Sequence, residues 1–95
     1  MIPGMAKAWR LWDDSHRKHP EYAGNPHRPV RPLIVLVQWK GVFHTFGADA
    51  LALSRIANAG LWRYDDVDAA TIGASDKAVI LCLENNHPVC IVEYV

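Results

Sequence analysis

A run of five large apolar residues, LIVLV, occupies positions 33–37. Its length and its β-branched residues predict a central strand that is buried on both faces. Apolar and aromatic residues resume over positions 42–46, and the intervening Lys40-Gly41 predicts a tight turn between two strands. Asp49 then stands where a carboxylate favours the first turn of a helix, ahead of an Ala/Leu-rich segment. The pattern over residues 33–57 therefore predicts strand, turn, strand and helix.

Apolar residues before this unit follow helical spacing. They recur at intervals of three and four from Met5 to Trp12, and the helix is expected to run to about Arg17. His19-Pro20 should end it, because a residue before proline avoids the helical region. Residues 22–32 contain three prolines, which favour an extended surface insertion.

The pattern after residue 50 predicts further elements. The second helix has a buried stripe of Ala50, Leu53, Ile56 and Ala57, and Asn58-Ala59-Gly60 should close it as a left-handed cap with Leu61 folding back. The remaining expected elements are strands at 62–64 and 70–73, a helix at 77–85 capped by Ser75 or Asp76, and a strand at 89–94. This alternation predicts an α/β (α+β) fold, with a mixed sheet of about five strands and three packed helices.

Composition narrows the class of protein. The chain has 95 residues, which suits a single domain covering 1–95, and its formal net charge is zero. Residues 1–32 hold six Lys and Arg against three Asp and Glu, which is compatible with a phosphate-facing patch and equally with chance. Cys82 and Cys90 lie in apolar surroundings, as buried thiols of a reducing compartment do. No leader or membrane-length apolar run occurs, so we expect a soluble cytoplasmic protein.

The stretch QWKGVFHTFGADA, residues 38–50, resembles the N-terminal mismatch-recognition domain of MutS-type DNA mismatch repair proteins, which carry Q-V-G-D-F-Y-E-L-F-G-E-D-A. In ungapped register, five positions are identical, and Phe43 stands where the family has Tyr. The wedge Phe and the Glu that contact a mispaired base fall on Val42 and His44. The segment RKHPE at 17–21 is similar to the family's K-x-x-H-P-D/E signature. The last twenty residues match its closing helix and strand at Asp76, Val89, Ile91 and Glu93.

The resemblance implies a non-enzymatic DNA-binding module of MutS N-terminal-domain type, with weak or lost mismatch specificity. In that interpretation Phe43 stacks on an unpaired base and His44 contacts a base edge or a phosphate. Lys40, Arg28 and Arg31 would contact phosphates of double-stranded DNA without sequence preference. The alternative for residues 42–44 is an ordinary half-buried strand, and the basic residues are then a solvated face.

Two other classes of function remain open. A protein-interaction or inhibitor module, of the kind that phages and mobile elements encode, would use the proline-rich insertion and exposed tryptophans. A small metal-dependent nuclease would need Asp49 to join the acidic turn at 65–68, which turn chemistry already explains. The His16, His19 and His27 set lacks a metal-ligand pattern, and no phosphate-binding loop or activated nucleophile is recognisable. We therefore expect neither a cofactor nor an enzymatic activity.

Overall fold

Residues 4–20 and 31–95 are described by the structure, a computed structural model. Within them the elements follow one another as α1 (Met5–Lys18), β1 (Ile34–Trp39), β2 (Val42–Phe46), α2 (Gly47–Ala57), β3 (Gly60–Tyr64), β4 (Val67–Gly73), α3 (Asp76–Glu84) and β5 (Val89–Glu93). Of the proposed insertion at 22–32, only Arg31 and Pro32 belong to the described residues. The predicted α+β class, with a mixed five-stranded sheet and three helices, is confirmed.

The strands lie in the order β3-β4-β2-β1-β5. β1 pairs in parallel with β5, with Ile34 opposite Val89, and every other pair is antiparallel. The two most β-branched segments are thus neighbours in one sheet. β1 is the buried, central strand that the sequence predicted: it lies inside the sheet between β2 and β5, and Ile34, Val35, Leu36 and Val37 are at most 1% exposed. β2 holds the middle position of the five, because it also pairs with β4.

The β1–β2 turn has the chemistry that the sequence predicted. Trp39 pairs with Val42, so Lys40 and Gly41 alone form the loop, and both have positive φ, at 53° and 75°. Two left-handed residues make a turn whose twist matches that of the flanking strands. β1 therefore continues to Trp39, beyond the predicted end at Val37, because the hairpin ladder carries it to the turn.

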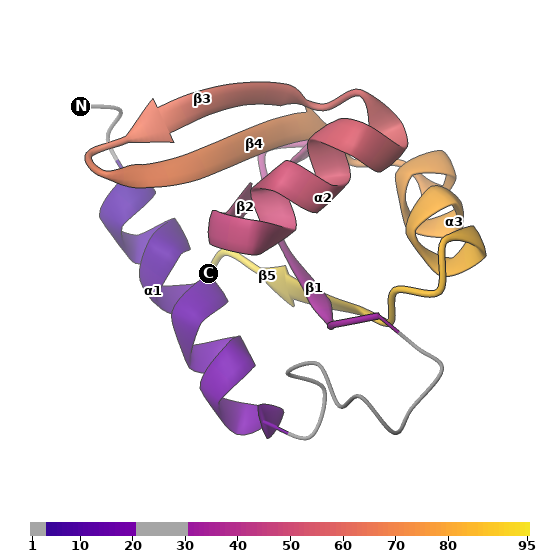
Figure 1. The fold of residues 1–95 in the computed structure, drawn as a ribbon. Coiled ribbons are helices and arrows are strands. Elements are labelled where there is room, and N and C mark those ends of the chain that lie inside the picture. The colour runs from indigo at the N-terminus through magenta and orange to yellow at the C-terminus, as the bar shows by residue number, and fades with distance from the viewer. Residues whose placement is uncertain (1–3, 21–30) are drawn as a thin grey trace.

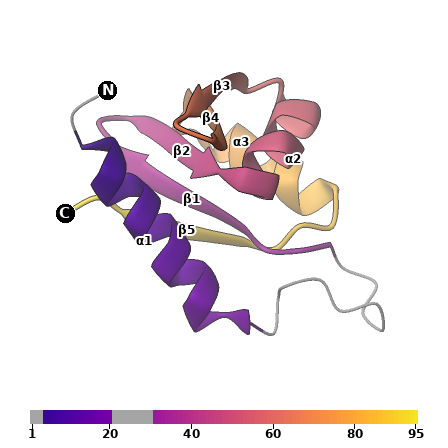
Figure 2. The same ribbon diagram turned by 60° about the vertical axis from the view of Figure 1, so that its left-hand side comes forward.

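Helices cover both faces of the sheet. Figure 2 shows α1 on one side, and α2 with α3 on the other. Side chains alternate accordingly along the strands: Leu36 and Phe43 pack into the core beneath α2 and α3, whereas Val37 and Phe46 pack against α1. We call the side covered by α1 the α1 face.

The helix ends follow local chemistry. α1 ends at Lys18, just before His19-Pro20, as predicted. α2 begins at Gly47 and is closed by left-handed Asn58, with φ of 56°. The expectation that Leu61 folds back on this cap is wrong, because Leu61 belongs to the edge strand β3 and is 49% exposed. Among the described residues, no helix is both long and apolar enough to cross a membrane.

Candidate functional site

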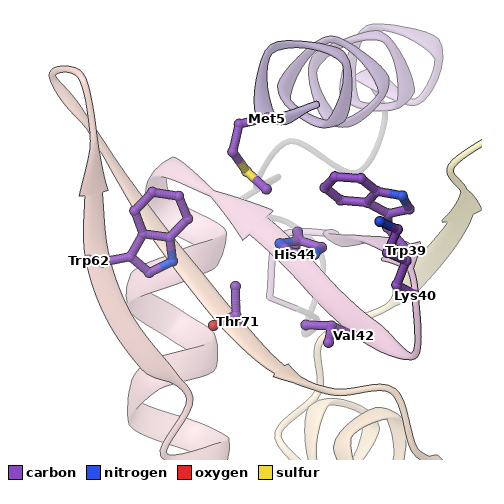
Figure 3. Close-up of a pocket in the computed structure, with 7 residues that line it drawn as sticks. All are labelled: Met5, Trp39, Lys40, Val42, His44, Trp62 and Thr71. Atoms are coloured by element: carbon purple, nitrogen blue, oxygen red, sulfur yellow. The ribbon is translucent and has the colours of Figure 1, made fainter. Parts of the chain in front are cut away.

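A hollow of about 490 Å³ opens on the α1 face, beside the first turn of α1 (Figure 3). Val42 and His44 of β2 and Thr71 of β4 form its floor. Two tryptophans, Trp39 of β1 and Trp62 of β3, stand at its sides, while Met5 of α1 and Lys40 of the hairpin turn complete the lining. Four strands therefore contribute to this one site.

Small residues on the sheet create the hollow. His44 lies opposite Thr71, which in turn lies opposite Gly60 on the edge strand. In the next row Val42 lies opposite Gly73. Directly opposed residues of antiparallel strands point to the same side, so both glycines leave space on the α1 face where other residues would place side chains. A Cβ atom built at Gly73 meets nothing within 4 Å.

The Trp39 side chain, at one side of the hollow, is supported by a second aromatic ring. The Tyr94 ring, which follows β5 on the far side of β1, stacks on it with centroids 4.5 Å apart and an interplanar angle of 17°. Opposite it, Trp62 makes an edge contact with Tyr64 at 6.5 Å. Both indoles are half-buried. Neighbouring rings therefore hold them in place, while part of each aromatic surface stays accessible.

His44 is the titratable group in the floor. Burial lowers the pKa of its imidazole below the ordinary value of 6.5, so the ring is uncharged at neutral pH. Its Nδ1 atom is buried and has no hydrogen-bond partner within the described parts of the chain. Its ring centroid lies 5.8 Å from that of Trp39. The floor thus offers a neutral hydrogen-bonding ring rather than a charge.

Lys40 supplies the charge at this site. Its Nζ lies 5.1 Å from the centroid of the Trp39 ring, and the side chain is exposed at the rim. Among the residues described as lining the hollow, it alone carries a charge at neutral pH, since His44 is neutral. The arrangement places one cation beside an aromatic, largely apolar concavity.

The residues proposed from sequence are only partly brought together. Lys40, Val42 and His44 meet at the hollow. Phe43 does not, because the strand alternation turns it to the opposite face, where it is 3% exposed in the core under α2 and α3. Phe43 therefore has no access to a base in this structure. Arg31 is exposed ahead of β1, at the opposite end of that strand from Lys40, and Arg28 lies outside the described residues.

Neither Trp39 nor Trp62 was assigned to the candidate DNA-contact site from the sequence. The hairpin itself contained the signal for Trp39: a turn of Lys40-Gly41 pairs Trp39 with Val42 and so predicts that both face the same side. Trp62 had no comparable local signal. It reaches the site only through the pairing of β3 with β4 and of β4 with β2.

Asp49 has a role different from the one expected. It does lie in the first turn of α2, but it is only 6% exposed. Its Oδ2 accepts hydrogen bonds from Trp12 Nε1 at 2.9 Å and from the backbone N–H of Val35 at 3.0 Å, and it lies 2.6 Å from His16 Nε2. The carboxylate raises the pKa of His16 through this hydrogen bond. Asp49 thus joins α1, β1 and α2.

The acidic residues considered for a metal are dispersed. Asp65 and Asp66 form the β3–β4 turn, where Arg63 donates to the Asp66 carbonyl and to the Asp68 carboxylate. Asp49 belongs to the interior network and is not part of this turn. Within residues 4–20 and 31–95, no three His, Cys, Asp or Glu side chains are grouped so that they could hold a metal ion.

Comparison with known proteins does not assign a family. No protein-family model matches the sequence, and no curated protein sequence matches it.

Proposed function

We propose that this protein is a non-enzymatic DNA-binding module that contacts DNA through the hollow on the α1 face. One observation carries the proposal. Val42 and His44, the positions where MutS-type recognition domains have their wedge Phe and their Glu, face the same open site, while Phe43 between them lies in the core. This alternation is what the ungapped register of the resemblance requires.

The charges support a phosphate contact at this end of the sheet. Lys40 is exposed at the rim, and no carboxylate is among the described lining residues. Arg31, at the other end of β1, would contribute a second, separate contact, and Arg28 is kept in the proposal from the sequence alone. Phosphate contacts of this kind make affinity fall as salt rises, with little dependence on sequence.

Salt-dependent binding to duplex DNA tests the proposal. Lys40→Asn is the informative variant, because Asn-Gly is the preferred pair for this turn and the fold should tolerate it. We expect weaker binding to all sequences and a salt slope reduced by about one. Lys77→Asn, an exposed lysine on α3 beyond the opposite face, is the matched control and should bind as the parent does. A duplex affinity that changes neither with salt concentration nor with Lys40→Asn would contradict the proposal.

A different surface favours the second candidate, a protein-interaction module. Ile80 and Leu83 of α3 are 50% and 54% exposed, and Ile91 on the edge strand β5 is 45% exposed. The tryptophans proposed for this role are instead half-buried on the α1 face. Replacing Ile80 and Leu83 with Asp should leave DNA affinity unchanged if the hollow is the functional site. If that variant folds but loses DNA affinity, the functional surface is on α3 rather than at the hollow.

A further inference from the structure

We propose that the hollow receives one unpaired nucleobase of a DNA strand, between Trp39 and Trp62, with the adjoining phosphate at Lys40. This inference rests on the proposed function and specifies its ligand. It also inverts the geometry that the resemblance implies. A wedge residue projects into a duplex, whereas Val42 lies at the bottom of a concavity and has no ring to insert.

The dimensions of the site suit a nucleotide. A volume of about 490 Å³ lies within the usual range of small-molecule sites and exceeds what a single flat base fills, which leaves room for its sugar. Space is open beside the floor at Gly73, which lies opposite Val42 and where a Cβ atom would meet nothing within 4 Å. A base that is already outside the helical stack can therefore enter there.

The walls suit a flat aromatic ring. Trp39 is backed by the stacked Tyr94 ring, so a base stacking on its other face would meet a supported indole and would displace the Lys40 ammonium, which lies 5.1 Å from the centroid of that ring. Trp62 approaches from the opposite side of the floor (Figure 3). Stacking on such side chains tolerates any base, because every base has an aromatic face.

The floor suits the edge of a base. Thr71 brings a hydroxyl that donates and accepts, and His44 brings an imidazole that burial keeps uncharged at neutral pH. Base edges present neutral donors and acceptors, which these two groups match without the cost of burying an ion. The single cation stands outside, at the rim, where the backbone phosphate of the same nucleotide would be.

A base paired within a duplex does not satisfy this site. It would have to leave its stack and its pairing partner, which costs free energy. An unpaired or bulged base does not have to meet this cost on binding. The site is therefore expected to distinguish an extruded base from a paired one, and to distinguish poorly between a mismatched and a matched pair that both remain stacked.

The probes are three otherwise identical DNA duplexes: one fully paired, one with a single extra thymidine, and one with an abasic residue at the extra position. Binding is measured by fluorescence anisotropy at one fixed salt concentration. We expect the bulged thymidine to bind about tenfold tighter than the paired duplex, and the abasic bulge to lose that advantage. Equal affinity for the thymidine and abasic bulges would overturn the inference while leaving DNA binding intact. Absence of binding to all three would overturn both proposals.

Gly73→Leu tests the location of the bound base. Gly73 lies opposite Val42, a residue of the floor, and a Cβ atom there meets nothing within 4 Å, so the leucine should occupy part of the hollow without disturbing the fold. Gln38→Leu adds the same side chain at an exposed position of β1 on the opposite face. We expect Gly73→Leu to abolish the preference for the bulged thymidine and Gln38→Leu to retain it. Trp62→Ala should lower the preference for the bulged thymidine, because it removes an aromatic ring beside the bound base. If both Gly73→Leu and Trp62→Ala left that preference unchanged, the base would bind elsewhere and the inference would be overturned.

Discussion

Nε2 of His16 lies 2.6 Å from Oδ2 of Asp49, and this contact ties the last turn of α1 to the first turn of α2. The carboxylate is nearly buried, whereas the imidazole remains 26% exposed. The hydrogen bond raises the pKa of His16 above 6.5, with burial opposing the shift to a lesser extent. The stability of the α1 attachment should therefore depend on pH.

The sign of this dependence follows from proton binding. The folded protein holds the His16 proton more tightly than the unfolded chain does, so the stabilisation is fully present below pH 6.5 and is lost as the pH rises through the folded pKa. Thermal melting should show that the difference in Tm between the parent and His16→Gln becomes smaller as the pH is raised from below 6.5 through the folded pKa of His16. A difference that stays constant, or grows with pH, would contradict this linkage. His44, whose pKa is lowered by burial, contributes the opposite trend, with stability lost as the pH falls below 6.5.

Asp49→Ala should be strongly destabilising. It removes the acceptor for Trp12 Nε1 and for the buried N–H of Val35, leaving donors without partners in the interior. We expect the free energy of unfolding to fall by about 3 kcal/mol, measured by urea denaturation. Asp13→Ala is the matched control, because Asp13 pairs at i,i+4 with the exposed Arg17 and acts on His16 through its charge, so the loss should be about 0.5 kcal/mol or less. Similar losses in the two variants would mean that the Asp49 network is not structural.

Val35→Asp should prevent folding. Val35 is 0% exposed in β1, between the parallel partner β5 and the antiparallel partner β2. An unpaired carboxylate there costs several kcal/mol, which is comparable with the total stability of a small domain, about 5–15 kcal/mol. Gln38→Asp places the same group at an exposed position of the same strand and should remain folded. Circular dichroism would check both, and a cooperatively melting Val35→Asp variant would refute the placement of β1.

Gly41→Val isolates the cost of the turn conformation. The Gly41 φ is 75°, yet a Cβ there has no neighbour within 4 Å, so the penalty comes from the backbone rather than from a clash. We expect a loss of about 1–2 kcal/mol in the free energy of unfolding. Gly73→Val, in open space without a positive φ, is the matched comparison and should cost less. Equal effects would indicate that the turn does not require its left-handed geometry.

Discrimination between a G·T mismatch and a perfect duplex should be poor. A tenfold preference requires about 1.4 kcal/mol, and stacking by a wedge aromatic supplies about 1–3 kcal/mol, which Val42 cannot provide. His44 likewise lacks the carboxylate of the family's Glu. The two duplexes should bind within a few-fold of each other in parent protein, and Val42→Phe/His44→Glu should raise the preference. Strong discrimination by the parent would be inconsistent with a Phe43 buried in the core.

Residues 33–50 show what local sequence determines in this protein. The β1 run, the Lys40-Gly41 turn and the following strand were each predictable, because alternation and a two-residue loop depend only on near neighbours. The same reasoning placed a helix near Asp49. Its exact start and the end of β1 were not predicted, since ladder pairing and tertiary packing decide them.

Long-range pairing explains what local sequence could not reveal. Asp49 had a sufficient explanation at the helix terminus, so nothing indicated that Trp12 and His16 would converge on it. The position of Trp62 depended on the order of three strands. Phe43 was assigned to the site by its aromatic character, although strict alternation with Val42 and His44 would have placed it on the other face.

The parallel pairing of β5 with β1 has a consequence for synthesis. β5 is the last of the five strands to leave the ribosome, while β1 and β2 form a local hairpin early. Until Val89 reaches Ile34, the outer N–H and C=O groups of β1 have no strand partner, and its apolar run remains a template for pairing with another chain. Premature termination within α3 would make that state permanent, and such fragments should accumulate as aggregates or be removed by proteolysis.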